Sequence, residues 1–318
     1  MKNSRKKKKR KLKKKTILYL IFFGGIALSV FALIMSFVTV LKYRSAQELY
    51  RSAQGIFLTA GESGVAPEGI EDKESGEDIS GAEDAAGEDT GAEGKTGKNS
   101  GGSESPKKEE KEWYELVTVD MELLDEMYPD TVGWLFFEDG EISYPIMQAR
   151  DNNYYLRRNY KGEPMNAGSI FLDRTANPDL TDAYMPIYGH NMRDGSMFGG
   201  LKKYAEDEEY YEEHKYFQII TADRARRYRI YEWAYISAYE GDVYTAHHRM
   251  GEETEKTLKL LSDNASRRVA EPDPGTGNYV LLSTCSEGDD RFVILSYLED
   301  EYVYPSKTLL PQVEEGDG

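Results

Sequence analysis

An uncharged apolar run near the N-terminus, Ile17 to Leu41, limits most strongly how this chain can fold. Its 25 residues would make a helix of roughly 37 Å, which is long enough to cross a hydrocarbon core of about 30 Å. It follows a segment in which 11 of the first 15 residues are Lys or Arg. Basic residues stay on the cytoplasmic side, so we expect a cytoplasmic tail at 1–16, a single-pass membrane anchor at 17–41 and an extracellular remainder. A cleaved secretory signal is disfavoured, because the run is long and no small-x-small cleavage site follows it.

Three segments of different composition follow the anchor. Residues 42–58 contain a seven-residue repeat, RSAQ at 44–47 and again at 51–54. The repeat predicts a short amphipathic stalk, with a solvated spacer favoured over a self-association helix. Residues 59–111 are rich in Gly, Ser, Glu, Asp and Ala and cannot bury enough apolar surface to offset chain entropy, so we expect a disordered acidic tether with a span of about 40 Å. Residues 112–318 then form one catalytic domain.

Charge and motif content exclude several classes of function. Residues 42–318 hold 29 basic and 57 acidic residues, a net charge of −28 that repels phosphates, so nucleic acid is not an expected partner. We find no His or Cys spacing typical of a metal site, no calcium-binding loop and no phosphate-binding loop. We therefore expect neither a metal nor a cofactor.

Short apolar runs separated by turn residues dominate the domain. A helix is predicted after Asp120, which can cap it, and two more at Ser196–Tyr204 and Glu252–Asn264. Mixed with strands, these helices indicate an α+β domain on a mainly β core, either a barrel or a sandwich. The eight predicted strands are Gly133–Phe137, Ile142–Met147, Ser169–Asp173, Pro186–His190, Tyr216–Thr221, Tyr228–Ser237, Asn278–Cys285 and Phe292–Leu298.

Cys285 is the single cysteine of the chain and stands at the end of a predicted buried strand. Stabilising cysteines of exported proteins come in pairs, so this thiol is either a small core residue or a reactive group. Arg291 opens the next strand, which brings it near the same edge of the sheet. A guanidinium there can favour a thiolate and stabilise an oxyanion, although a surface ion pair with a neighbouring acid is an equal alternative.

Of four histidines, His190 is the best candidate for an acid or base. It ends an apolar strand and precedes a turn of small and polar residues, whereas His214, His247 and His248 lie in polar surroundings. A histidine at one strand end can reach a cysteine at another, as nucleophilic catalysis by a thiol requires.

The domain resembles the class B sortases over residues 114–298. Four segments carry the resemblance: Pro129–Trp134 with Tyr144–Ile146; Asp151–Leu156; Ala167–Asp173 running on to Tyr188–Phe198; and Leu282–Cys285 with Arg291. It implies an eight-stranded sortase barrel with an N-terminal helix and a helix in the loop between strands six and seven, where Glu252–Asn264 falls.

The resemblance also implies roles for individual residues. His190, Cys285 and Arg291 take the catalytic positions. Substrate-groove candidates by the same comparison are Ser283, Thr284, Asn152, Leu156, Tyr244 and Thr245.

The implied activity is that of a cysteine transpeptidase on the surface of a Gram-positive cell. It would cleave a sorting-signal peptide of the Asn-Pro-x-Thr type through a thioester and pass it to an amine of peptidoglycan or of a pilin. One alternative is an exported cysteine hydrolase or an L,D-transpeptidase, although the Ser-His-Gly-Cys context typical of the latter is absent. A catalytically inactive peptide-binding barrel is the other.

Overall fold

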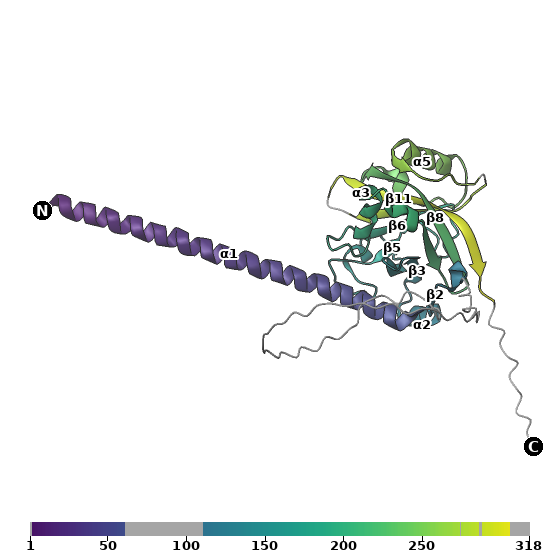
Figure 1. The fold of residues 1–318 in the computed structure, drawn as a ribbon, viewed down its shortest axis with the longest axis horizontal. Helices are drawn as coiled ribbons and strands as arrows, with labels where there is room; N and C mark the ends of the chain where they lie inside the picture. The colour runs from purple at the N-terminus through teal and green to yellow at the C-terminus, as the bar shows by residue number, and fades with distance from the viewer. Residues whose placement is uncertain (1, 61–110, 274, 286–287, 306–318) are drawn as a thin grey trace, which may run out of the picture.

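The computed structural model describes residues 2–60, 111–273, 275–285 and 288–305 (Figure 1). Eight of its strands form a closed barrel in the order β11-β10-β6-β5-β4-β3-β7-β8, and β11 pairs with β8 to complete the ring. The barrel strands are β3 (Thr131–Phe137), β4 (Ser143–Met147), β5 (Ile170–Leu172), β6 (Tyr184–His190), β7 (Tyr216–Ile220), β8 (Arg224–Ser237), β10 (Tyr279–Cys285) and β11 (Asp290–Val303). The predicted eight-stranded barrel is confirmed.

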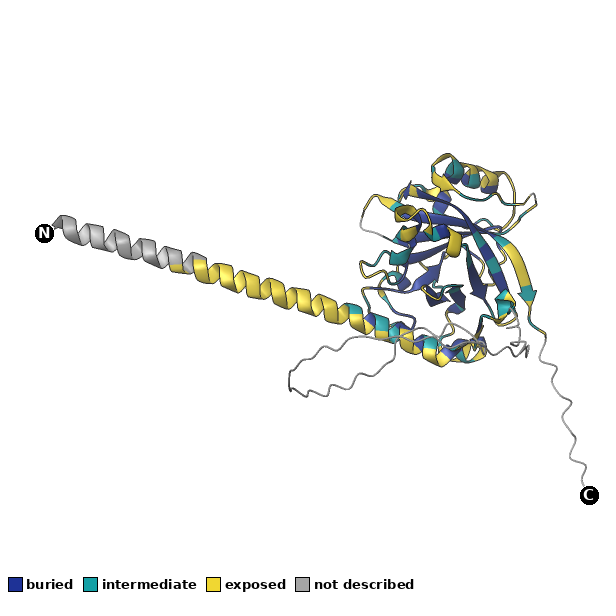
Figure 2. Ribbon diagram, viewed as in Figure 1, coloured by how far each residue is buried: buried dark blue, intermediate teal, exposed yellow. Residues whose placement is uncertain are grey.

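The barrel strands form where the sequence supplies apolar and β-branched residues bounded by turns. Trp134, Leu135 and Phe137 of β3 are fully buried, and the Phe137 ring stacks on Phe217 of β7 at a centroid distance of 5.3 Å. The barrel interior is therefore a packed core, which holds the strand ends at its rim in fixed positions (Figure 2).

Several helices and short helical turns lie between the barrel strands. The helix α2 (Met121–Met127) follows Asp120, as predicted. Asp120 caps the helix, because its carboxylate accepts a hydrogen bond from the Leu123 amide at 3.0 Å. The helix α5 (Glu252–Asp263) lies between the sixth and seventh barrel strands, as expected, and is followed by β9 (Ala265–Arg268) on the outer edge of β8. The remaining short elements are α3 (Lys203–Glu206), α4 (Tyr210–Glu213), η1 (Trp113–Glu115), η2 (Tyr155–Arg157), η3 (Gly199–Lys202) and η4 (Gly241–Tyr244). The helix predicted at Ser196–Tyr204 is replaced by η3 and the single turn α3.

The N-terminal helix α1 (Lys2–Phe57) is continuous from the basic segment to the barrel (Figure 1). By length and composition it is long and apolar enough to cross a membrane, and residues 22–41 are exposed (Figure 2). Its last turns differ from the solvated spacer that the sequence favoured. Ala46, Tyr50, Ala53 and Phe57 are buried against the barrel, because their spacing places them along one face of the helix.

The RSAQ repeat explains this docking. Both glutamines of the repeat bond the barrel: Gln47 donates to the Asp194 carboxylate at 3.2 Å and Gln54 donates to the Ser143 carbonyl at 2.7 Å. Between them, the Tyr50 hydroxyl donates to the Gly168 carbonyl at 2.6 Å. Residues 42–57 therefore belong to the folded unit that carries the barrel.

A two-stranded sheet joins the end of α1 to the barrel. β1 (Leu58–Ala60) pairs antiparallel with β2 (Val117–Val119), and Ala60 lies opposite Val117. The predicted tether, 59–111, lies outside the described residues except at its two ends. Its first residues, Thr59 and Ala60, are paired with Thr118 and Val117 a few residues beyond its other end, so the segment does not set the distance between α1 and the barrel.

Candidate active site

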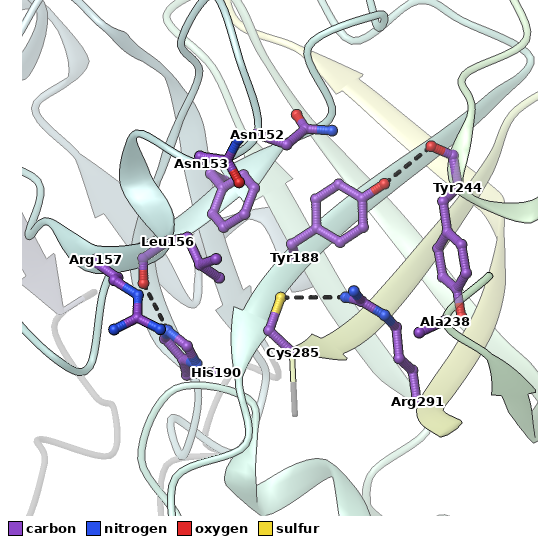
Figure 3. Close-up of a pocket in the computed structure, with 11 residues that line it drawn as sticks. Asn152, Asn153, Leu156, Arg157, Tyr188, His190, Ala238, Tyr244, Cys285 and Arg291 are labelled. Atoms are coloured by element: carbon purple, nitrogen blue, oxygen red, sulfur yellow. Dashed lines mark hydrogen bonds between the residues drawn. The ribbon is translucent and has the colours of Figure 1, made fainter. Parts of the chain in front are cut away.

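Two parallel strands bring the predicted nucleophile and the predicted acid–base residue together. β6 and β10 run side by side in register, with Cys285 opposite His190 at their carboxyl ends. Adjacent strands lie about 4.8 Å apart, and residues in register point to the same face of the sheet. The two side chains therefore share one edge of the barrel, where both line the same cavity (Figure 3).

Arg291 reaches the sulfur from the other neighbour of β10. It stands at the start of β11, and its Nη1 donates to the Cys285 Sγ at 3.6 Å (Figure 3). Burial raises the pKa of the Cys285 thiol, and the Arg291 guanidinium opposes that rise. The sulfur thus has a cation in place to stabilise the thiolate when it forms.

The His190 ring is held by a backbone carbonyl. Its Nε2 lies 2.6 Å from the Leu156 oxygen (Figure 3). A carbonyl only accepts, so Nε2 donates in this contact and Nδ1 is the ring nitrogen left to accept a proton. Gly168 makes room for this carbonyl: its φ is +60°, and an added Cβ would lie 2.5 Å from the Leu156 oxygen.

The cavity around the sulfur has a volume of about 480 Å³. Its wall combines the three predicted catalytic side chains with polar and aromatic groups from four surrounding segments. It is lined by Asn152, Asn153, Leu156, Arg157, Phe171, Tyr188, His190, Ala238, Tyr244, Cys285 and Arg291. Its volume falls within the range of about 300–1,000 Å³ that is typical of ligand-binding sites.

A buried carboxylate fixes one wall of the cavity. Asp173 is 1% exposed and accepts hydrogen bonds from the Asn152 amide at 2.6 Å and the Tyr188 hydroxyl at 3.0 Å. The same hydroxyl lies 3.1 Å from the Tyr244 carbonyl oxygen, and the Tyr244 ring lies 5.2 Å from the Arg291 guanidinium. One network therefore joins Asn152, Tyr188 and Tyr244 into a single surface.

The six groove candidates divide into three groups. Asn152, Leu156 and Tyr244 line the cavity. Ser283 is fully buried, on the same strand face as Cys285 two residues away, and its hydroxyl has no hydrogen-bond partner among the described residues.

Thr284 and Thr245 do not line the cavity. Thr284 points to the opposite face of β10 because strand side chains alternate, and its hydroxyl bonds both the amide and the carbonyl of Phe292 at 3.0 Å. Thr245 is exposed, and its hydroxyl donates to the Gly241 carbonyl at 3.0 Å.

Five lining residues were not singled out from the sequence: Asn153, Arg157, Phe171, Tyr188 and Ala238. Strand periodicity could have identified Tyr188, which stands two residues before His190 and so faces the same way. Arg157 reaches the cavity from the three-residue η2 and Ala238 from the turn after β8, and neither element is long enough to show a periodicity.

Comparison with known proteins identifies relatives of the barrel. The family model described as the sortase domain matches residues 139–299. The curated sortase B of Listeria monocytogenes is 34% identical over 193 residues, which cover 59% of this chain and 71% of that protein. The sortase B of Staphylococcus aureus is 27% identical over 196 residues, covering 62% and 74%.

A solved structure extends the likeness to three dimensions. The sortase B of Bacillus anthracis, determined in complex with AAEK1, superposes with a TM-score of 0.51 at 32% identity. The match covers 56% of this chain and 83% of that one.

Proposed function

This chain belongs to the class B sortases, a family of cysteine transpeptidases, and from that premise we propose that it cleaves a sorting-signal peptide at Cys285 and transfers it to an amine. The observation that carries the proposal is the meeting of Cys285, Arg291 and His190 at one cavity, with the guanidinium 3.6 Å from the sulfur. Acyl transfer needs a nucleophile, a stabiliser of the oxyanion and a proton carrier, and these three side chains supply them.

In the first half-reaction, Nδ1 of His190 accepts the thiol proton as Sγ attacks the scissile carbonyl. Arg291 donates to the oxyanion of the tetrahedral intermediate. Collapse of the intermediate breaks the peptide C–N bond, His190 returns the proton to the leaving amine, and a thioester on Cys285 remains.

In the second half-reaction, an incoming amine attacks the thioester carbonyl. His190 takes a proton from the amine, and the thiol is restored as the new amide forms. We propose an Asn-Pro-x-Thr type signal as the peptide and a peptidoglycan or pilin amine as the acceptor. The enzyme would act at the cell membrane, with its N-terminus in the cytoplasm and its barrel outside.

The groove for the peptide follows from the lining. Asn152 and Leu156 on one side and Tyr244 on the other flank the sulfur, and the Asp173 network holds Asn152 and Tyr244 in place. Ser283 offers a free buried hydroxyl beneath this surface. Thr284 and Thr245 have no such support, since their hydroxyls are engaged by the backbone.

Mass spectrometry tests the proposal directly. The protein, incubated with an Asn-Pro-x-Thr peptide, should gain the mass of the acyl fragment on Cys285 and release it as an amide when an amine is added. Cys285→Ala should form no adduct, and His190→Ala almost none. Turnover retained in Cys285→Ala would rule the scheme out. Release mainly as the free acid would favour a hydrolase, and an unreactive thiol would favour a peptide-binding module.

A further inference from the structure

The contacts between α1 and the barrel occur in a definite order along the helix. Counting outward from Leu41 at about 1.5 Å per residue, Gln47 meets Asp194 at roughly 9 Å and Tyr50 meets Gly168 at roughly 14 Å. Gln54 meets Ser143 at roughly 20 Å, and Phe57 accepts the Asp120 amide at roughly 24 Å. Of these four contacts, the one made by the loop that holds Asp194 therefore lies nearest the apolar run.

That loop, residues 191–197, is bonded to the ends of both catalytic strands. The Asn191 amide donates to the Cys285 carbonyl at 3.2 Å, and the Phe198 amide donates to the His190 carbonyl at 3.0 Å. The end of the barrel that carries the cavity thus faces the apolar half of α1, whereas the turn at Asp223 lies at the other end of the 14-residue strand β8.

An exposed aromatic ring and an exposed arginine at this end suit a membrane interface, and they stand beside the exposed acids Asp194, Asp289 and Asp290. Tyr239 is 82% exposed in the turn after β8, and its hydroxyl lies 3.4 Å from Asp289, beside the start of β11. Its neighbour Ala238 lines the cavity. Arg193, in the loop next to α1, is exposed as well. Tyrosine is enriched at the level of lipid headgroups, and arginine is attracted to anionic headgroups.

We propose that the active-site end of the barrel rests on the external face of the membrane that α1 crosses, with Arg193 and Tyr239 among the phospholipid headgroups. The continuous helix α1 acts as a rigid strut that sets this position. The proposal depends on the membrane anchor in the proposed function. It follows from helix continuity, because a helix that is docked over its last turns cannot let the barrel swing away from the bilayer. The cavity then accepts peptides held within about 20 Å of the bilayer surface rather than further out.

Site-specific fluorescence in vesicles tests this orientation. The full-length Cys285→Ala protein, which has no other thiol, would receive one cysteine as Arg193→Cys, Tyr239→Cys or the control Asp223→Cys. Each variant would be labelled with a small fluorophore and reconstituted in phosphatidylcholine–phosphatidylglycerol vesicles that contain a headgroup nitroxide lipid. We expect a loss of fluorescence at positions 193 and 239 several times larger than at 223.

A second protein tests whether the continuity of α1, rather than attachment to the membrane alone, holds the barrel in this orientation. A flexible Gly-Ser insertion between Lys42 and Tyr43 breaks α1 just before the docked turns, and it should reduce quenching at 193 and 239. Equal quenching at all three positions, in protein that floats with the vesicles, would overturn the orientation while leaving the anchor intact. Failure to float would instead remove the anchor on which both proposals depend. Neither readout requires catalysis, so loss of the proposed activity would be recognised separately.

Discussion

Two opposing effects act on the sulfur of Cys285. Burial keeps the proton on the thiol, and the guanidinium of Arg291 favours its removal. The raised pKa means that the thiolate fraction grows as pH rises through the alkaline range.

The first prediction concerns the pH dependence of this thiol. Because removing the cation removes the effect that lowers the pKa, Arg291→Ala should raise the midpoint of iodoacetamide alkylation by about one pH unit and slow alkylation at pH 7.5 about tenfold. Cys285 is the single cysteine, so the adduct mass reports one site. Arg193→Ala is the matched control, because it removes an exposed arginine that does not line the cavity. Faster alkylation of Arg291→Ala at neutral pH would contradict this account.

A second prediction concerns the carbonyl that holds His190. A Cβ at Gly168 would displace the Leu156 oxygen and loosen the ring, so Gly168→Ala should lower kcat/KM by about 100-fold, since small misplacements of catalytic groups cost that much. Alkylation of Cys285 should keep its normal rate.

Gly140→Ala provides the control for Gly168→Ala. Gly140 also has a positive φ, of +77°, but an added Cβ there meets nothing within 4 Å. It introduces backbone strain without moving a catalytic group. Equal kcat/KM values for the two variants would show that the effect of Gly168→Ala comes from backbone strain and not from displacement of the Leu156 oxygen.

At the scale of elements, the sequence located all eight barrel strands but missed the polar extensions of the two longest, β8 and β11. β8 begins at Arg224 rather than Tyr228, and β11 continues to Val303 rather than ending at Leu298. These extensions are held by ion pairs between the strands, such as Arg226 to Glu301 at 2.7 Å. Charged residues carry no apolar alternation, so a pattern based on hydrophobicity ends too early.

The docked turns of α1 show a second limit of sequence reasoning. The spacing of Ala46, Tyr50, Ala53 and Phe57 indicates an amphipathic helix, but the surface that covers it comes from residues such as Ser143 and Gly168 far along the chain. The predicted catalytic residues were easier to find, because each stands at the end of a recognisable apolar strand and the hairpin from β10 to β11 links Cys285 to Arg291. The Asp173 network and the turn residues of the cavity depend on tertiary contacts and were not foreseen.

The third prediction tests this docked surface. Ala53 is fully buried, so Ala53→Glu places an unpaired charge against the barrel and should lower the free energy of unfolding by about 3 kcal/mol. Ser52→Glu, on the exposed face of the same turn, should change it by less than about 0.5 kcal/mol. Urea unfolding of residues 42–318, which omit the apolar run, measures both. Matching urea midpoints for the two variants would mean that the helix face containing Ala53 is not buried in solution.

At the scale of the whole molecule, the paired strands β1 and β2 make residues 61–110 dispensable for the fold. Replacing them by about eight Gly and Ser residues shortens the closed loop and should raise the free energy of unfolding by about 1.5 kcal/mol. Turnover of a soluble peptide should be unchanged, because Ala60 and Val117 stay opposite each other. Denaturant midpoints and peptide turnover check both expectations, and loss of either folding or turnover would assign the segment a structural role.

Under the proposed membrane anchoring, the pairing of β1 with β2 also bears on how the barrel is retained at the membrane. A protease that nicks the acidic stretch between residues 60 and 111 severs the covalent link between anchor and barrel. The barrel nevertheless stays attached, because the strand pair and the buried side chains of Tyr50, Ala53 and Phe57 belong to the piece that keeps the anchor. Shedding into the medium therefore requires these contacts to come apart together, and a cut in the acidic stretch does not by itself release the catalytic unit.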